Sequence, residues 1–306
     1  MDNLKTCPNC KRMVDENATF CPNCGASLAP AGQQQGDQYQ APPQESNQRQ
    51  WQAPGMQPGP RDASPEGMIR EAAQMRGSTD EVLNELWAFI PLISVILVIA
   101  VSGSLYLVTT DPVVSSGISL GIAFVAQILI VILIYKLFNR NNLHNRREMM
   151  LRAAIVDLMK KNAAEKGISQ AIASQVQTME SINYESRSYE PERSAALWAI
   201  LPIIPVVGWI FGLIALYYLT SYPPGHDRRW HAFTQQTQYA GSQLGMNLML
   251  PSWRSLPERS FIIYFILTIV TLGIFMIYWY YVLIKDMNEH YRSQWQFEDQ
   301  LLREIQ

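Results

Sequence analysis

Four long uncharged segments dominate the pattern of apolar and polar positions along the chain. They cover residues 86–108, 112–135, 195–222 and 260–284. At about 1.5 Å per residue, a helix made from each segment is long enough to cross a hydrocarbon core of about 30 Å. The pattern therefore predicts an all-α membrane protein with four transmembrane helices and soluble segments attached to them.

The four segments contain an internal repeat. The first segment matches the third without gaps, and the matched pairs include Leu86/Leu197, Trp87/Trp198, Pro91/Pro202, Tyr106/Tyr217 and Pro112/Pro223. A second register relates the residues that follow segments two and four, through Tyr135/Tyr281, Leu137/Leu283, Asn142/Asn288, His144/His290 and Arg146/Arg292. We interpret this as two repeated helix pairs, which cross the membrane in the same direction. The first pair lies in residues 66–193 and the second in residues 194–306, each with a helical extension after its last span.

One feature favours a different topology. Tyr217, Leu219, His226 and Arg228 carry the same Tyr-x-Leu-x6-His-x-Arg spacing a third time, on what the four-span scheme makes the outer side. If this copy is meaningful, segments three and four are re-entrant hairpins, broken at residues 205–208 and 271–273. Residues 221–259 would then be cytoplasmic.

The first residues of the chain carry a separate metal-binding pattern. Two CPNC sequences, ten residues apart, supply Cys7, Cys10, Cys21 and Cys24. Each Cys-x-x-Cys turn presents two thiolates, so the pair completes a closed four-cysteine site for tetrahedral zinc. A redox-active pair would need a thioredoxin-like domain, and a rubredoxin-type iron site would have little chain between its two turns.

This module resembles the short zinc ribbon found at the start of many prokaryotic membrane proteins, and we assign it to residues 1–28. We expect structural zinc, because metal binding at about 10–16 kcal/mol can fold a unit too small to build a core. Its charged residues are balanced, as is the whole chain at a net charge of -2. No nucleic-acid partner is therefore expected, and a protein partner is preferred.

A polar stretch separates the ribbon from the spans. Residues 29–65 are rich in Gln, Pro, Gly and Ala and poor in large apolar residues. Such a composition buries too little surface to offset chain entropy, so we predict a disordered linker.

The distribution of Lys and Arg predicts the orientation in the membrane. Twelve lie near span ends on the proposed inner side, against four in the loop of residues 223–259 and none at residues 109–111. Residues 1–20 contain no apolar region of the kind found in signal peptides, so we expect none before the first span. We therefore expect a multi-pass protein of the plasma membrane with both termini in the cytoplasm.

Candidate chemistry within the helical part is sparse. The four spans contain no ionisable side chain, which disfavours ion pumps and charged-substrate transporters. His226 and His231 are five residues apart and share a helix face poorly, and His144 and His290 show no acidic partner at ligand spacing. We interpret these histidines as solvated interfacial residues rather than as a second metal site. No catalytic motif is visible, so no enzyme activity is expected.

The last span carries a further resemblance. The run from Thr271 to Trp279, TLGIFMIYW, is followed by an amphipathic helix. It resembles the TLGIYxxYW hallmark of an uncharacterised family of small prokaryotic membrane domains, with Phe275 where Tyr is usual. That family has no known activity, so the resemblance implies no catalytic residue.

Two classes of function stay open. The first is a membrane-anchored interaction or regulatory protein that presents the ribbon and the helical extensions to a cytoplasmic partner. The second is a small channel or carrier for a neutral or lipidic solute, which requires a polar path through the bundle. The helical extensions could also pair with those of a second copy of the chain to form a homo-oligomer.

Overall fold

The computed structural model describes residues 4–6, 13–15, 62–108, 111–249 and 255–306. The chain divides into two units, Met1–Gln57 and Pro58–Gln306. The second unit includes both of the predicted helix pairs. We describe the two units separately.

The described part of the first unit is a short antiparallel strand pair. Strand β1 (Leu4–Thr6) pairs with β2 (Met13–Asp15), so that Leu4 lies opposite Asp15 and Thr6 opposite Met13. The first CPNC sequence falls between these strands. The four predicted zinc ligands and the predicted linker up to residue 61 lie outside the described residues.

All the regular secondary structure in the described part of the second unit is helical. Its elements are α1 (Pro65–Gln74), α2 (Arg76–Thr79), η1 (Glu85–Phe89), α3 (Ile90–Val108), α4 (Pro112–Glu165), α5 (Ala173–Tyr189), α6 (Ala195–Ile200), η2 (Leu201–Ile203), α7 (Gly208–Gln243), α8 (Phe261–Val270) and α9 (Phe275–Glu304). Side-chain caps fix several helix starts. Ser64 caps α1, Asp111 caps α4 and Ser260 caps α8, in each case by accepting a backbone N–H of the first turn.

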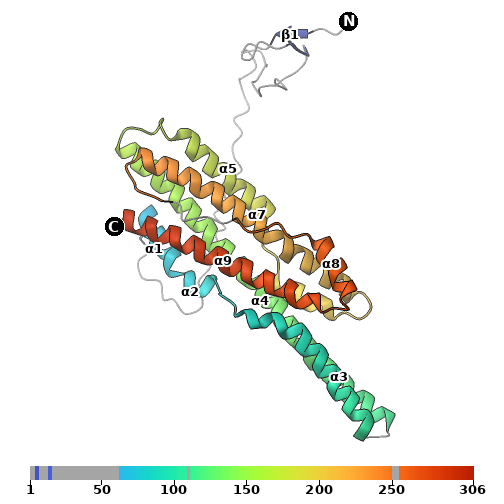
Figure 1. Cartoon of the computed structure of the whole chain (residues 1–306). Coiled ribbons are helices and arrows are strands. Elements are labelled where there is room, and N and C mark those ends of the chain that lie inside the picture. Colours follow the sequence, from blue (N-terminus) through green and yellow to red (C-terminus); the bar gives the residue numbers. More distant parts are fainter. Residues whose placement is uncertain (1–3, 7–12, 16–61, 109–110, 250–254) are drawn as a thin grey trace, which may run out of the picture. The chain divides into compact units, whose positions relative to one another are not determined.

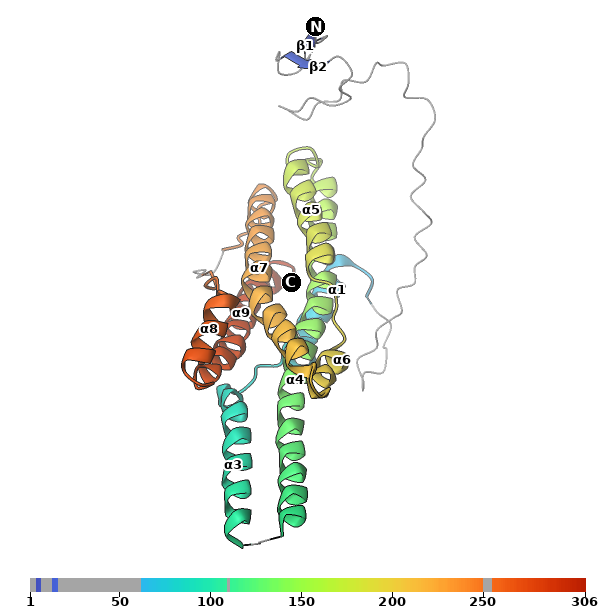
Figure 2. The same ribbon diagram turned by 90° about the vertical axis from the view of Figure 1, so that its right-hand side faces the viewer.

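Helix α3 and the first half of α4 form a hairpin that projects from the rest of the unit (Figure 2). These are the two helices, among the described residues, that are long and apolar enough to cross a membrane. In the most apolar stretch of 18 residues in each helix, only 11% and 17% of the residues are buried. A core helix of a water-soluble protein would bury these side chains, whereas exposed apolar side chains are favourable in contact with lipid. The chain is therefore a membrane protein.

The second half of α4 is the centre of a helical domain. It continues without a break from the hairpin and packs against α1, α5 and α7 (Figures 1 and 2). It also contacts α9 through the ion pair of Arg147 with Glu298. The core of this domain is apolar and fully buried, with Leu151 and Ile155 from α4, Trp230 and Phe233 from α7, and Phe297 from α9.

Segments three and four differ from the prediction, because neither is a continuous helix. The third breaks between η2 and α7, where Val206 has a positive φ of 69°. The fourth breaks between α8 and α9, where Leu272 and Gly273 have φ values of 50° and 92°. A hydropathy average over twenty residues does not register such breaks, so the prediction of four crossing helices is not confirmed for these two segments.

Both ends of segment three lie beside the second half of α4. At its start, the Asn142 side chain bonds both the carbonyl and the amide of Arg193, at 2.6 and 3.3 Å. After its end, His226 Nε2 lies 3.1 Å from His144 Nε2. A crossing helix would separate these ends by about 30 Å. Residues 223–249 begin beside the second half of α4, so their predicted placement on the opposite side is not confirmed.

Candidate metal centre

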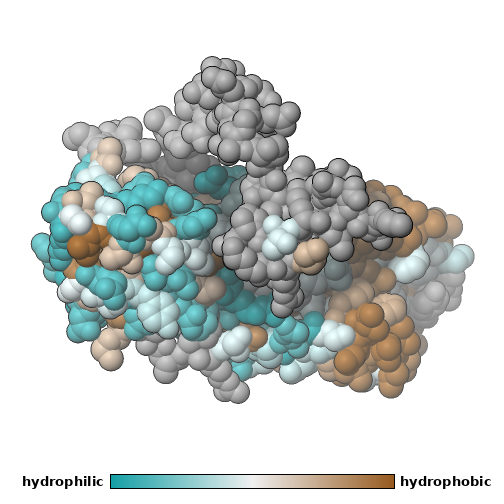
Figure 3. Space-filling model, turned by 90° about the horizontal axis from the view of Figure 1, so that it is seen from above, coloured by the Kyte–Doolittle hydropathy of each residue, from teal (hydrophilic) through white to brown (hydrophobic). Residues whose placement is uncertain are grey.

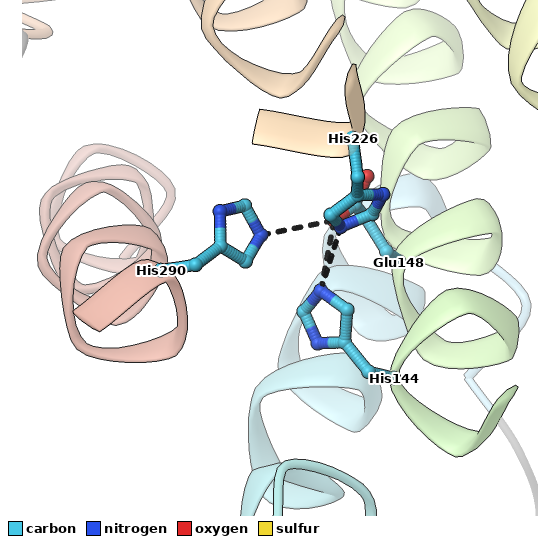
Figure 4. Close-up of side chains that lie close together, drawn as sticks. All are labelled: His144, Glu148, His226 and His290. Atoms are coloured by element: carbon cyan, nitrogen blue, oxygen red, sulfur yellow. Dashed lines mark hydrogen bonds and ion pairs between the residues drawn. The ribbon is translucent and has the colours of Figure 1, made fainter. Parts of the chain in front are cut away.

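Three histidines from three helices converge inside the helical domain (Figure 4). His144 comes from α4, His226 from α7 and His290 from α9, and Glu148 follows His144 by one turn of α4. One ligand atom from each of these four residues lies within 4.8 Å of every other. All four side chains are buried, with at most 1% of each exposed. We call this group the histidine–glutamate cluster.

The spacing of the ligand atoms suits one metal ion. His144 Nε2 lies 3.1 Å from both His226 Nε2 and Glu148 Oε2, and His226 Nε2 lies 3.1 Å from the same carboxylate oxygen. His290 Nε2 is 3.9 Å from it. Four atoms bound at about 2.0–2.1 Å to a tetrahedral zinc ion would be about 3.3–3.4 Å apart. The atoms of His144, Glu148 and His226 are already near this spacing, whereas His290 Nε2 would have to move closer to them to complete the shell.

A second layer of carboxylates holds the other nitrogen of each ring. His144 Nδ1 lies 3.0 Å from Asp80, and His290 Nδ1 lies 2.9 Å from Asp227. His226 Nδ1 lies 3.0 Å from Glu190. A carboxylate at this position favours the tautomer with the proton on Nδ1, which leaves the Nε2 lone pair free to bind metal. Metal-binding histidines in proteins are typically oriented in this way.

The same tautomers make the cluster unfavourable without a cation. Three Nε2 lone pairs and the Glu148 carboxylate oxygen then face one another in a space that excludes water. Such groups repel more strongly at low dielectric than they would in solvent. A divalent cation among the four atoms, or added protons, would remove this repulsion.

Buried cations and backbone donors balance the second-layer carboxylates. Asp80 accepts bonds from Arg147, at 2.7 and 3.1 Å, and from Trp295 Nε1 at 2.7 Å. Burial by itself would raise the pKa of Asp80, but His144 and Arg147 hold that pKa below its ordinary value. The carboxylate is therefore ionised at neutral pH.

The remaining two carboxylates are held in the same manner. Arg229 donates to Glu190 at 2.7 Å, and together with His226 it keeps the pKa of this buried carboxyl low despite the opposing effect of burial. Asp227 accepts the Leu256 backbone N–H at 3.0 Å. On the ligand itself, Arg152 binds the Glu148 oxygen that faces away from the histidines.

Burial also sets the protonation state of the histidines. It lowers the pKa of His144 to about 3, against the raising influence of Asp80, and it lowers the pKa of His290. Both imidazoles are therefore neutral near pH 7. Neutral imidazole is the form that binds a metal.

The structure corrects the prediction that these histidines are exposed to solvent. The prediction of solvated interfacial residues is wrong for His144, His226 and His290, which are fully buried. His231, five residues after His226, is not part of the cluster, as the helix geometry predicts. The overlooked member of the cluster is Glu148, whose His-x3-Glu spacing from His144 puts both side chains on one helix face. The third copy of the Tyr-x-Leu-x6-His-x-Arg spacing was the other usable signal, since the three copies supply the three histidines.

Comparison with known families identifies two parts of the chain. A zinc-ribbon domain matches residues 6–28, which confirms the predicted module and indicates that it binds zinc. A domain of unknown function, DUF4234, matches residues 259–298 and confirms the resemblance at the last apolar segment. This second match includes α8 and His290 but not the other three residues of the cluster. No curated protein and no solved structure matches the chain.

Proposed function

We propose that this protein is a membrane-anchored metal-binding and interaction protein. Its helical domain binds one divalent transition metal at the histidine–glutamate cluster, and zinc is the first candidate. Its N-terminal ribbon binds a second, structural zinc ion and recruits a cytoplasmic protein. The single observation that carries the proposal is the convergence of three Nε2 atoms and one carboxylate oxygen, with a carboxylate behind each imidazole.

The donor set favours a transition metal over magnesium or calcium. Imidazole nitrogen suits zinc and its first-row neighbours, whereas magnesium and calcium prefer oxygen ligands. Four protein ligands in a buried position complete a tetrahedral shell, which is typical of structural zinc sites. The metal would therefore hold the domain together, and the proposal includes no catalytic step.

Metal binding would connect the helical domain to the membrane hairpin. The four ligands join α4, α7 and α9, so the ion would fix these helices against one another. Asp80, behind His144, lies in the segment that leads into η1 and α3. Occupancy of the cluster would therefore also set the position of the chain where it approaches the membrane.

We further propose that the unit is built from three repeats rather than two, each an apolar hairpin followed by a histidine-bearing helix. Asp80 and Glu190, which lie behind two of the histidines, each precede by five residues the helix that begins their repeat.

Two asparagines make equivalent contacts between repeats. Asn142, two residues before His144, bonds the Arg193 backbone, three residues beyond Glu190. Asn288, two residues before His290, bonds the Leu83 backbone, three residues beyond Asp80. These related contacts support a threefold arrangement around the cluster.

The charge distribution supports a cytoplasmic domain. Once residues 223–249 and 255–259 are assigned to the same side as the second half of α4, all fifteen Lys and Arg residues near the apolar segments in the described part of the chain lie on that side. The connection at residues 109–111 has none. Because positive residues are retained in the cytoplasm, the helical domain and the ribbon would both face it, at the plasma membrane.

Metal content tests the central proposal. In the full-length protein with all four ribbon cysteines replaced by serine, we expect one equivalent of bound metal by elemental analysis after purification in detergent. In that background, His226→Ala removes a ligand and should abolish stoichiometric binding. His231→Ala is the matched control, because it lies on the same helix outside the cluster. No bound metal in the parent, or equal metal in both variants, would refute the proposal.

Partner recruitment by the ribbon needs a separate test. In-cell crosslinking of the full chain should yield a defined protein adduct that Cys21→Ser with Cys24→Ser removes, while the amount of protein in the membrane is unchanged. An adduct pattern that is indifferent to the ribbon cysteines would count against a recruiting role. A homo-oligomer would give adducts at multiples of the chain mass.

The alternative of a channel or carrier has less support. It assumed four crossing helices, but two of the described helices are long and apolar enough to cross. Two helices in contact with each other cannot enclose a path within one chain. Solute transport would therefore require several copies of this hairpin.

A further inference from the structure

Two apolar hairpins lie outside the helical domain that contains the histidine–glutamate cluster. The first runs from α6 through η2 into the start of α7, and the second from α8 into the start of α9. No charged residue occurs at residues 194–225 or 260–284. Large apolar side chains are exposed along both hairpins, among them Val206, Val207 and Trp209 in the first and Ile266, Val270 and Leu272 in the second.

Each hairpin has the reach of one leaflet. Helix α8 has 10 residues, which at about 1.5 Å per residue extends about 15 Å. The six residues of α6 and the three of η2, at about 1.5 and 2.0 Å per residue, also extend about 15 Å. The hydrocarbon core of a bilayer is about 30 Å thick. Each first arm therefore reaches the midplane from one surface and no further.

The tips of the hairpins suit hydrocarbon and not water. Val206 and Leu272, at the two breaks, are 87% and 95% exposed and both have positive φ. Branched apolar residues rarely adopt this left-handed conformation. A water-exposed turn would normally have glycine or asparagine at such a position. In lipid, the same two side chains would be favourably solvated.

Several backbone amides next to the tips bond within each hairpin. Val207 and Gly208 donate to Pro205 and Ile204, both at 2.8 Å. At the other tip, Gly273 donates to Thr268 at 2.7 Å, and Phe275 donates to the Thr271 hydroxyl at 2.9 Å. Irregular backbone in a membrane requires such internal partners, because lipid offers none.

Charged and aromatic side chains collect at the bases of the hairpins. Arg259, at the start of the second, binds Asp286 through two bonds of 2.5 and 2.7 Å and donates to the Tyr264 hydroxyl at 2.9 Å. Arg193, at the start of the first, stacks on the Tyr218 ring at 3.6 Å. This combination is typical of a membrane–water interface.

The hairpins lie beside the point where the crossing helices leave the helical domain. In Figure 2, α8 and α6 flank the base of the α3–α4 hairpin. In Figure 3, the hydrophobic surface is gathered at one end of the molecule, and the opposite end is mainly hydrophilic. A buried apolar cluster that includes Ala88, Leu133, Ala199 and Trp279 joins the hairpins to the spans. One bilayer can therefore contact all three hairpins.

We propose that both broken hairpins insert into the single leaflet next to the helical domain and turn back at the midplane, while α3 and α4 alone cross. Their partner is the acyl chains of that leaflet. The proposal does not depend on metal binding, because it uses the exposed surface and not the histidine–glutamate cluster.

The test measures sidedness and lipid contact in the full chain. Protease recognition sites are introduced after Gly167, between α4 and α5, and after Gln243, at the end of α7. In sealed membrane vesicles, both sites should be cut from the same side, whether or not metal is bound. Cleavage of the two sites from opposite sides would overturn the proposal.

Lipid contact is read from a photoreactive amino acid at residue 206 or 272. Both positions should form adducts with phospholipid acyl chains. Tyr184, a 74% exposed aromatic residue of α5, provides a control position in the helical domain and should form none. Absence of lipid adducts at residues 206 and 272 would show that the tips lie in water or against protein, and would also overturn the proposal.

Discussion

His144 and His226 are 82 residues apart in the sequence, yet their Nε2 atoms lie 3.1 Å apart. The break after η2 makes this contact possible, because it returns the chain to the second half of α4, where segment three also begins. The candidate metal centre and the reversal of segment three therefore depend on the same break in the chain.

The carboxylates behind the histidines should control metal affinity. Replacing Glu190 with Gln retains the size of the side chain but removes the charge that orients His226. We expect metal affinity to fall by about 10–100-fold, as is usual when a second-layer partner is lost. Competition with a chelator of known affinity measures the change in the variant that lacks the ribbon cysteines.

Glu192→Gln is the control for this substitution. Glu192 is two residues away and pairs with Arg146 on the surface, where both side chains are well exposed. Its metal affinity should match that of the parent. Equal affinities for the Glu190 and Glu192 variants would remove the role assigned to the second layer.

Arg147 should be far more important for stability than its neighbour Arg146. Arg147 is buried and joins Asp80, at 2.7 Å, to Glu298, at 2.8 Å. Arg147→Met leaves both carboxylates without this partner, and the loss of one member of a buried ion pair costs about 3–5 kcal/mol. Arg146→Met loses only an exposed pair, worth about 0–1 kcal/mol. Denaturant unfolding in detergent micelles measures both, and similar losses would contradict the assigned network.

Asn288 should be a second determinant of stability. It accepts the Leu83 amide at 3.2 Å, donates to the Leu83 carbonyl at 2.8 Å and also contacts Arg140. Asn288→Leu leaves buried backbone groups without partners, at a cost of about 1–3 kcal/mol for each. Asn142→Leu, the equivalent change at a half-buried position, should cost less because water can reach the freed groups. A larger loss for Asn142 would argue against this difference in burial.

The sequence predicts well those features that depend on local pattern. The crossing length of residues 86–108 and 112–135 needs only a count of uncharged positions, and the structure contains two helices of the required length and hydropathy there. The ribbon follows from cysteine spacing, and the family comparison agrees. Both signals are complete within a few tens of residues.

The features that the four-span prediction missed depend on distant residues or on single backbone angles, and only the alternative with re-entrant hairpins included the two breaks. His226 can join the cluster only because the chain reverses near Val206, and the uncharged run around that residue resembles a continuous span. The carboxylate behind His144 is 64 residues earlier in the chain, so no spacing rule connects the two. Only the His144–Glu148 pair lies within one helix, and its spacing could have indicated a ligand pair.

X-ray absorption at the metal edge tests the account most directly, in the full-length protein that lacks the four ribbon cysteines. We predict a first shell of four nitrogen and oxygen atoms at about 2.0–2.1 Å, with the outer-shell scattering of three imidazoles. His290→Ala should reduce the imidazole contribution or abolish binding. A protein without bound metal, or a shell of water oxygens without imidazole scattering, would contradict the account.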